Sequence, residues 1–487
     1  MTMNILVIDV GTSSMRGILY SPNVEKLASH RVAYSVESSG ICVEQSAVDW
    51  FNALTEICGK IAAGGFAVDA LALTSQRSSL IPVDDLGRPL RKAIMWQDTR
   101  NTGIIEELKQ HAESIAALTG ARLNTVYSGS KMTWLRQNEP AIYSGAYKLC
   151  TIADYLTHLM TGEFVTDETY GSRSLLMGLR SRTWEPELLK LFEVDEDKLC
   201  KIIPPGSISG RVTRAFSQLT GIAEGIPLIS AGGDQQCGAL GQGVFDRECA
   251  SITFGTSACI LKAAEQVPDR SEGLLCGAHA VPGQFVLEGS MLTCGAAFDW
   301  ARRTLFPNEN FDSVNAAVRS SPPGANGVIA IPAFQGRGTP GWNSAVRGGF
   351  LNLNLNSTRQ DMMRALLESI IYEMVNNLYA FAVLGEPVSG IRIGGGVTKN
   401  QEIARILSDA SGLPVWCNVD QNEDTAFGAW MNAAVSLGLV TDYREAFAFA
   451  PCNLTVTEPD SRQFETYAEG RKRMNDACAR LYSDVKR

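Results

Sequence analysis

The chain opens with the stretch Ile5-Leu6-Val7-Ile8-Asp9-Val10-Gly11-Thr12-Ser13-Ser14-Met15-Arg16, and its Gly-Thr-Ser triplet returns about half of the chain later as Gly255-Thr256-Ser257. Each triplet stands between two short apolar, β-branched runs, a pattern that predicts a β-hairpin with the triplet at its turn. The N–H and hydroxyl groups of such a turn can bind phosphate oxygens. We interpret the triplets as equivalent turns of a duplicated chain that holds one nucleotide from both sides; the alternative is two unrelated turns.

The bulk composition indicates a globular protein with two large domains. The 487 residues are 45% hydrophobic and 20% charged, and a chain of this length divides into more than one core. The net charge of −9 argues against nucleic acid and anionic membranes as partners. No apolar run approaches the ~20 residues of a membrane helix, and no secretion signal is visible. We therefore expect a cytoplasmic protein with no nucleic-acid or membrane partner.

Structural metal sites and disulfides find little support in the sequence. The 12 cysteines form no C-x-x-C pair, and the 4 histidines are not spaced as zinc ligands. We expect reduced thiols and no structural zinc.

The order of the expected elements predicts an α/β fold. Strand patterns at residues 68–74, 227–231, 327–332 and 390–393 alternate with amphipathic helical patterns at residues 46–63, 102–118, 359–383 and 399–411. A boundary near Gly241-Gln242-Gly243 divides the chain into a domain at residues 1–241 and a domain at residues 242–487, called the first half and the second half below. We expect the halves to pack directly and to leave a cleft between them.

Three motifs carry candidate chemistry. Asp9 ends a strand beside the first turn, where its carboxylate can hold Mg²⁺ through water. Asp234 follows Gly232-Gly233 at the end of a buried strand, where open α/β sheets keep their sites, although it is equally consistent with the N-cap of a helix at residues 235–241. Gly394-Gly395-Gly396 suits close approach to a nucleotide, or alternatively a tight strand-to-helix turn. The Walker A and protein-kinase motifs are absent from the sequence.

With these residues laid out, the chain resembles the FGGY family of carbohydrate kinases, which includes glycerol kinase and xylulokinase. The resemblance runs in order from residue 5 to about residue 450. The segments that carry it are residues 9–16, 43–50, Thr74-Ser75-Gln76-Arg77, Met95-Trp96-Gln97-Asp98-Thr99-Arg100, Asp234-Gln235, 251–257, Leu287-Glu288-Gly289-Ser290, Gly295 and 394–400. The resemblance implies two actin-like (ribonuclease H-like) ATPase domains with a cleft between them. The first half would form the sugar and phosphate side and the second half the nucleotide side.

The same resemblance implies ATP-dependent phosphorylation of a hydroxyl on a small sugar, ketose or polyol, with ATP and Mg²⁺ as cofactors. It implies that Asp234 is the catalytic base and that Asp9 and Asp234 hold the metal. The residues implied to bind nucleotide and phosphate are Gly11, Thr12, Ser13, Ser14, Arg16, Gly255, Thr256, Ser257, Gly295, Gly395, Gly396 and Asn400. Those implied to bind the substrate are Gln76, Arg77, Trp96, Asp98 and Gln235. A structural ion pair for Arg16, core packing for Trp96 and a homodimer are left open.

The predicted sugar pocket departs from that of glycerol kinases. They carry Glu where this chain has Ser78, and Tyr where it has Val126, with Tyr127 one place further on. A polyol is held by charge-assisted hydrogen bonds, so the lost carboxylate predicts poor use of glycerol. Three alternatives are glycerol kinase proper, an actin-like ATPase acting on a protein partner, and a ribokinase-like enzyme suggested by Ala231-Gly232-Gly233-Asp234.

Overall fold

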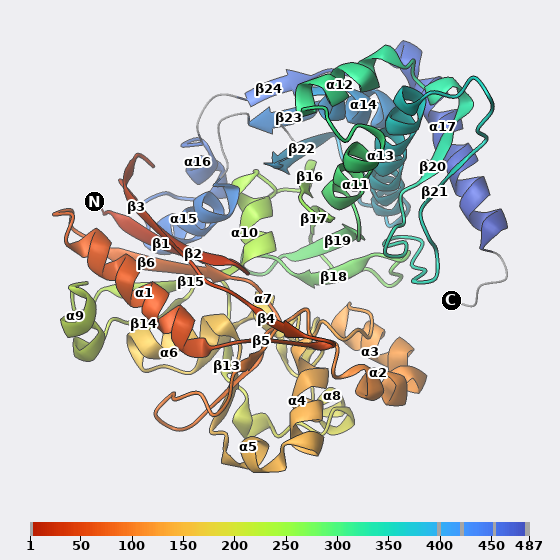
Figure 1. The fold of residues 1–487 in the computed structure, drawn as a ribbon. Coiled ribbons are helices and arrows are strands. Elements are labelled where there is room, and N and C mark those ends of the chain that lie inside the picture. Colours follow the sequence, from red (N-terminus) through yellow and green to blue (C-terminus); the bar gives the residue numbers. More distant parts are fainter. Residues whose placement is uncertain (1–2, 397–400, 419–422, 451–453, 483–487) are drawn as a thin grey trace.

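The computed structural model describes residues 3–396, 401–418, 423–450 and 454–482 (Figure 1). A central sheet in each half organises these residues. The sheet of the first half has the strand order β14 (Ile208–Arg211), β15 (Pro227–Gly233), β6 (Ala70–Ser75), β1 (Ile5–Val10), β2 (Ser14–Tyr20) and β3 (Lys26–Ala33). The sheet of the second half has the order β18 (Leu275–Ala278), β19 (Phe285–Met291), β17 (Ala258–Ala264), β16 (Cys249–Phe254), β22 (Gly390–Gly395), β23 (Val415–Asn418) and β24 (Leu454–Thr457).

The two sheets repeat one pattern around the two Gly-Thr-Ser turns. β1 pairs antiparallel with β2 and parallel with β6, and β16 pairs in the same way with β17 and β22. The next strands outward, β3 and β19, are antiparallel to the hairpins, whereas β15 and β23 extend the parallel side. The expected α/β fold and both expected hairpins are therefore confirmed.

Helices cover both sheets. In the first half they are α1 (Ala47–Ala62), α2 (Thr102–Leu108), α3 (Ala112–Thr119), α4 (Ser128–Asn138), α5 (Pro140–Gly145), α6 (Ile152–Thr161), α7 (Glu168–Gly171), α8 (Pro186–Leu191), α9 (Arg214–Thr220) and α10 (Asp234–Gly241). In the second half they are α11 (Gly295–Leu305), α12 (Phe311–Ser320), α13 (Arg359–Val383), α14 (Gln401–Ser411), α15 (Asp424–Ser436), α16 (Tyr443–Phe447) and α17 (Ser461–Leu481). Short 3₁₀ turns within the described residues include η1 (Lys109–His111), η2 (Glu196–Lys198) and η3 (Ala325–Gly327).

Within the part of the chain that the structure describes, short strands form five small sheets outside the central ones. They pair β4 (Glu37–Ser39) and β8 (Ala93–Ile94) with β5 (Cys42–Gln45), β7 (Ile81–Val83) with β9 (Lys148–Cys150), β10 (Val165–Asp167) with β13 (Lys201–Ile203), β11 (Met177–Gly178) with β12 (Thr183–Trp184), and β20 (Ile329–Ile331) with β21 (Gly349–Leu351).

Local sequence accounts for the long helices. The buried side chains Trp50, Leu54, Ile57 and Ile61 recur at helical spacing along α1 and pack on the first sheet. Thr358 and Asp361 form a reciprocal capping box that starts α13, which has the predicted bounds. The predicted strands and helices are present within a few residues of their expected ends, except that residues 399–400 lie outside the described residues.

One expected element is wrong. The helix expected at residues 102–118 is divided into α2 and α3 by the 3₁₀ turn η1. The turn tightens the backbone at Lys109–His111, and Ile104, Leu108 and Ile115 then all reach the same apolar cluster.

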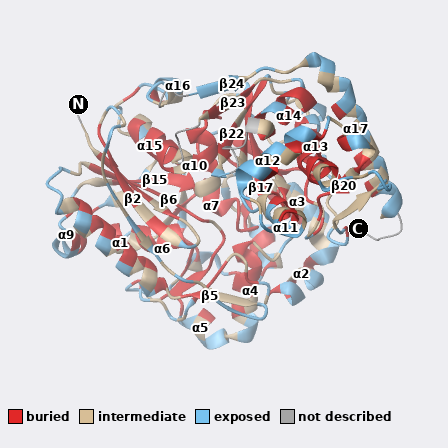
Figure 2. Ribbon diagram, turned by 45° about the horizontal axis from the view of Figure 1, so that its top comes forward, coloured by how far each residue is buried: buried red, intermediate tan, exposed pale blue. Residues whose placement is uncertain are grey.

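Helices α10 and α15 lie between the two sheets (Figure 1). Although α15 belongs to the second half of the sequence, Ala426, Phe427 and Trp430 pack against strands of the first sheet. Ala239 of α10 in turn packs against Leu261 of the second sheet. Figure 2 shows buried residues concentrated along α10, α15 and the sheets, with exposed residues on the outer helices. The division after residue 241 remains a prediction, and the packing of α15 crosses it.

Candidate active site

A pocket of about 210 Å³ lies where the two halves meet. Residues from both halves line it: Asp234, Gln235, Gly238, Gln242, Thr253, Gly395, Gly396, Asp424 and Thr425. The pocket follows one face of α10, with Asp234 at the first turn of the helix and Gln242 just beyond its last residue. Candidate residues that lie more than 150 positions apart, such as Asp234 and Gly395, are thus brought to one cavity.

Asp234 is the first residue of α10, directly after the end of β15. A helix N-terminus stabilises negative charge, and Asp234 Oδ1 also accepts the Gln235 N–H at 2.8 Å. Burial nevertheless raises the pKa of the Asp234 carboxyl to about 6, because the Arg77 guanidinium, 3.8 Å away, offsets desolvation only in part. A Cβ on Gly233 would lie 2.7 Å from Arg77 Cδ, so a larger residue there would displace the Arg77 side chain.

Arg77 belongs to a charge network that joins the halves. Its Nη1 lies 3.6 Å from Oε2 of Glu288 on β19, and Arg173 Nη2 donates to the same oxygen at 2.6 Å. The two arginines come from the first half and the glutamate from the second. The guanidinium groups lower the pKa of the buried Glu288 carboxyl despite its desolvation. Arg77 therefore stands between the carboxylates of Asp234 and Glu288.

The first Gly-Thr-Ser turn is supported by side chains that surround it. The Gly11 carbonyl accepts from the Tyr34 hydroxyl at 2.6 Å and from Gln76 Nε2 at 3.1 Å. The Thr12 hydroxyl lies 3.4 Å from both Gln76 Oε1 and Trp96 Nε1. Two residues predicted to bind substrate, Gln76 and Trp96, thus contact the predicted phosphate turn.

Ser13 and Ser14 complete the first turn. The Ser13 side chain is exposed, and its carbonyl accepts the Tyr34 N–H at 3.0 Å. Arg31 Nε donates to Ser14 Oγ at 3.0 Å.

Asp9 and Arg16 face each other across the first hairpin. Arg16 Nη2 lies 3.4 Å from Asp9 Oδ2, and Arg16 Nη1 lies 3.5 Å from Oε1 of Glu423, the residue before α15. Lys26 and Tyr20 also bind Glu423, at 2.6 and 3.3 Å. Burial raises the pKa of Asp9, with Arg16 opposing that rise.

The second Gly-Thr-Ser turn is exposed, and backbone N–H groups at the start of α11 hold its carbonyl groups. Gly255, Thr256 and Ser257 are exposed, and the Gly255 and Thr256 carbonyls accept N–H groups of Gly295 and Cys294 at 2.9 Å. Gly295 starts α11, so this helix begins at the predicted phosphate turn.

The glycine motif of the second half ends β22 beside the second hairpin. Gly395 has a φ of +94°, and a Cβ on it would meet the Phe254 carbonyl oxygen at 2.1 Å. A Cβ on Gly394 would meet Gln242 Nε2 at 2.1 Å. Gly396 is exposed at the pocket, and Asn400 lies outside the described residues.

Asp98 is fully buried and already has partners. Its Oδ2 accepts the Val43 N–H at 2.6 Å, and both of its oxygens accept from Arg100. These bonds occupy its carboxylate within the protein. By contrast, Gln235 lines the pocket.

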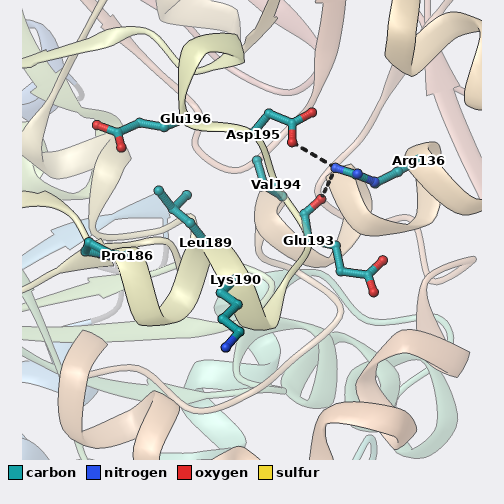
Figure 3. A pocket seen from close by; sticks show the side chains of 8 residues that line it. All are labelled: Arg136, Pro186, Leu189, Lys190, Glu193, Val194, Asp195 and Glu196. Atoms are coloured by element: carbon teal, nitrogen blue, oxygen red, sulfur yellow. Dashed lines mark hydrogen bonds and ion pairs between the residues drawn. The ribbon is translucent and has the colours of Figure 1, made fainter.

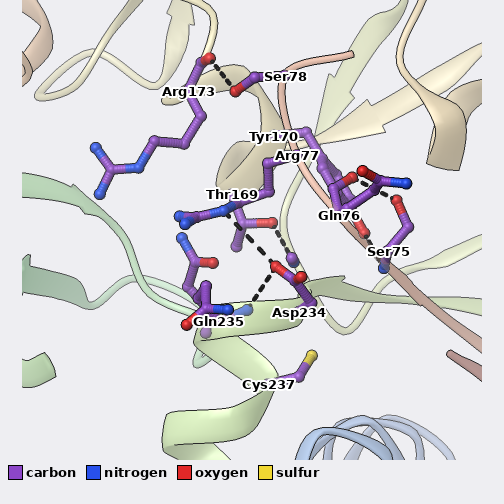
Figure 4. A network of polar contacts seen from close by, with 12 residues as sticks. Ser75, Gln76, Arg77, Ser78, Thr169, Tyr170, Arg173, Asp234, Gln235 and Cys237 are labelled. Atoms are coloured by element: carbon purple, nitrogen blue, oxygen red, sulfur yellow. Dashed lines mark hydrogen bonds and ion pairs between the residues drawn. The ribbon is translucent and has the colours of Figure 1, made fainter. Parts of the chain in front are cut away.

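Sequence reasoning missed several polar residues of this region. Asp424 starts α15 and accepts from Gln242 Nε2 at 2.9 Å, and burial raises the pKa of its carboxyl to about 6. Arg173 and the neighbouring residues 167–172 were also missed, because no recognised motif covers them. Only their tertiary contacts identify them, and Figure 4 shows Thr169, Tyr170 and Arg173 around Arg77 and Asp234.

A larger pocket of about 560 Å³ lies away from the predicted site residues (Figure 3). α8 and the residues after it form much of its wall, and Arg136 of α4 donates across it to Asp195 Oδ1 at 3.0 Å. None of the residues predicted to bind nucleotide or substrate lines it.

Known proteins match the chain over nearly its whole length. The sequence pattern of the N-terminal domain of the FGGY family of carbohydrate kinases matches residues 4–241, and that of the C-terminal domain matches residues 250–437. A xylulose kinase of Staphylococcus xylosus is 27% identical over 88% of this chain and 90% of its own length. A glycerol kinase of Oceanobacillus iheyensis is 30% identical over 91% of both chains. The crystal structure of a gluconate kinase from Lactobacillus acidophilus superposes with a TM-score of 0.93 at 24% identity, covering 100% of this chain and 99% of that one.

Among the described residues, no helix combines the length and apolar character needed to cross a membrane.

Proposed function

The chain belongs to the FGGY family of carbohydrate kinases, and we propose that Asp234 is the base of its reaction. The enzyme transfers a phosphoryl group from ATP to a hydroxyl of a small sugar or polyol. The observation that carries the assignment of Asp234 is its position at the start of α10, beside Arg77 and in a pocket lined by both halves. A protein-directed ATPase is not favoured.

Asp234 would accept the proton of the attacking hydroxyl. A general base works best with a pKa near the operating pH, and burial brings the pKa of Asp234 to about 6. At neutral pH the carboxylate is mostly ionised and still basic enough to take the proton. Arg77 would then hold a neighbouring substrate oxygen while it keeps Asp234 ionised.

The two turns would bind the phosphates from opposite sides. Thr12 and Ser13 would contact them from the first half, and Thr256 and Ser257 from the second, through hydroxyl and backbone N–H groups. The remaining nucleotide would lie along Gly295, Gly395 and Gly396, where the absence of side chains permits close approach. Closure over this site would exclude water, to which an open kinase would lose phosphate.

The donor set near the first turn fits Mg²⁺. Asp9 and Asp234 influence each other's charge, and Mg²⁺ typically binds one or two carboxylates together with water and substrate phosphates. When bound, the ion would neutralise charge on the transferred phosphoryl group. Arg16 already pairs with Asp9 and Glu423, so we assign it to positioning Asp9 rather than to direct phosphate binding.

We assign the sugar to the space around Arg77, Gln235 and Asp234, and expect a substrate of at least three carbons for which glycerol is a poor replacement. The Ser78 hydroxyl donates to the Arg173 carbonyl at 3.0 Å and offers no carboxylate to a polyol. Glu288 supplies a carboxylate from the second half instead. Because Asp98 is occupied by Arg100 and Val43, we assign it a structural role beneath the pocket.

A coupled ADP-release assay with glycerol, longer polyols, ketoses and sugar acids tests this proposal. We expect turnover with at least one longer substrate and a lower kcat/KM for glycerol. Activity highest on glycerol would assign the chain to glycerol kinase proper. ADP release that is stimulated only by a protein would refute the kinase proposal.

A further inference from the structure

The residues at positions 167–174 form hydrogen bonds with β6 and β15 of the first half and with β18 and β19 of the second half. Tyr170 and Thr169 contact the ends of β6 and β15, Ser172 Oγ accepts the Ala278 N–H at 3.3 Å, and Arg173 binds Glu288. The segment thus touches both halves, and Figure 4 shows Thr169 and Tyr170 beside Arg77, which follows β6, and Asp234, which follows β15.

The parallel pairing of β6 with β15 is interrupted where the site begins. The register shifts between Ser230 and Gly232, and Gly232 has a φ of +107°. Such a bulge redirects the residues that follow it, and here those residues are Gly233 and Asp234. A bulge also leaves backbone groups without ladder partners, which is costly in a buried region.

The Tyr170 hydroxyl fills that interruption. It accepts the Ser75 N–H of β6 at 3.0 Å and donates to the Gly232 carbonyl of β15 at 2.9 Å. The side chain is 2% exposed. One hydroxyl therefore replaces a direct ladder bond and sets the separation of the two strand ends.

Thr169 holds the next residue of the same strand. Its Oγ1 accepts the Gly233 N–H at 2.8 Å and donates to Asp167 Oδ1 at 2.5 Å. The other Asp167 oxygen accepts from the Ser230 hydroxyl at 2.5 Å. The residue directly before Asp234 is thereby tied to a fully buried carboxylate.

We propose that Tyr170 and Thr169 are positioning residues that hold the Asp234 carboxylate against the Arg77 guanidinium. Neither touches the pocket, and both act through the backbone at the ends of β6 and β15. The proposal rests on the proposed function of Asp234.

The first test is Tyr170→Phe, which keeps the ring and removes the bridge. A misplacement of about 1 Å costs on the order of 10²-fold in rate, so we expect kcat to fall roughly 10- to 100-fold, with KM for ATP within about twofold of wild type.

Tyr143→Phe is the matched control. The Tyr143 hydroxyl also accepts a backbone N–H, that of Asp195 at 3.0 Å, and its side chain is 3% exposed. It lies on α5, at the other end of the first half from α10 (Figure 1). This variant should lose a similar amount of stability and keep its kcat.

Thr169 provides a second pair of variants. Thr169→Val removes the hydroxyl at constant shape and should lower kcat, whereas Thr169→Ser keeps the hydroxyl and should restore most of it. This pair still tests the proposal if Tyr170→Phe fails to fold.

Crystal structures of wild type and Tyr170→Phe test the positioning role without any substrate. Their result therefore does not depend on whether the proposed function of Asp234 is correct. We expect the Arg77–Asp234 separation to be longer in the variant. An unchanged separation would overturn the proposal. So would a kcat equal to that of Tyr143→Phe, or a kcat of Thr169→Ser no higher than that of Thr169→Val.

Discussion

At the scale of single residues, the pKa of Asp234 suits the proposed chemistry because effects of opposite sign act on its carboxylate. Desolvation raises its pKa, Arg77 lowers it and Asp9 raises it further. The helix N-terminus and the Gln235 N–H stabilise the ionised form. The balance leaves a carboxylate that is ionised at neutral pH and more basic than an exposed aspartate.

Asp234→Asn should abolish most phosphoryl transfer. General-base assistance contributes about 10²–10⁴-fold, and a neutral amide cannot take the proton. Coupled ADP release measures the loss, and ATP titration should show nearly unchanged binding. Asp195→Asn, at an exposed ion pair with Arg136, serves as the control. Turnover of Asp234→Asn within about tenfold of wild type would remove Asp234 from the mechanism.

The rate should also follow the ionisation of Asp234. Since its folded-state pKa is about 6, kcat/KM should rise with pH through that value and fall below it as the base becomes protonated. Arg77→Gln removes the cation that lowers this pKa, so its acid limb should move to higher pH, and its KM for the sugar should rise more than its KM for ATP. Arg136→Gln should leave both unchanged. Coincident profiles for Arg77→Gln and wild type would contradict the assigned pairing.

At the scale of elements, helices α10 and α15 carry glycines where they cross. The missing side chains allow the two halves of the chain to approach closely. A Cβ on Gly241 of α10 would lie 1.9 Å from the Asp424 carbonyl oxygen, and one on Gly428 of α15 would lie 1.9 Å from the Cys237 carbonyl oxygen. Backbone therefore packs on backbone at this crossing. The pocket residues Asp234 and Asp424 are placed by the ends of these same helices.

Gly241→Ala should be destabilising even though alanine favours helix. Overpacking a close contact costs about 1–3 kcal/mol, and here the obstacle is backbone that cannot rotate away. Gly103→Ala in α2 is the matched control, because a Cβ at Gly103 meets nothing within 4 Å. That variant should instead gain about 0.4–1 kcal/mol. Equal thermal midpoints for the two variants would show that the crossing is not tightly packed.

At the scale of the whole molecule, polar contacts bridge the halves around the site. Arg173 and Arg77 bind Glu288 across the interface, and Asn432 Nδ2 of α15 donates to the carbonyls of Ala231 at 2.7 Å and Ala280 at 2.9 Å. These contacts link the strand end before Asp234 to the second half. Ligand binding between the halves should therefore change their separation.

Sugar and nucleotide together should compact the enzyme. The ligands would supply contacts to both turns and draw the halves inward. Small-angle scattering with neither ligand, each alone and both together should show a smaller radius of gyration only for the full combination. A radius that stays constant in all four states would argue against a closing cleft.

Glu288→Gln tests the bridge itself. Breaking a buried ion pair by removing one partner costs about 3–5 kcal/mol, because Arg173 would remain buried without its counter-charge. We expect lower thermal stability together with a raised KM for the sugar. Glu368→Gln, which breaks the buried pair with Arg364 inside the second half, should lower stability without changing that KM. A sugar KM that is the same in both variants would place Glu288 outside the substrate pocket.

The sequence by itself determined the hairpins, the alternation of strands and helices, and the positions of Asp9 and Asp234 at strand ends. Hydrophobic periodicity, turn glycines and helix caps act over a few residues, so they can be read in order along the chain. The resemblance to a family supplied the reaction. Local pattern did not show the break between α2 and α3, which follows from how apolar residues meet one cluster.

Only the tertiary structure decided which polar groups face each other. The Tyr170 hydroxyl bridges positions 95 and 62 residues away, and Arg173 meets Glu288 across 115 residues. The local sequence does not identify these residues, because an arginine or a tyrosine in a short polar segment is usually interpreted as a surface residue. Their burial, and with it the basicity of Asp234, arises only when the two sheets and the helices between them exclude water from the ends of β6 and β15.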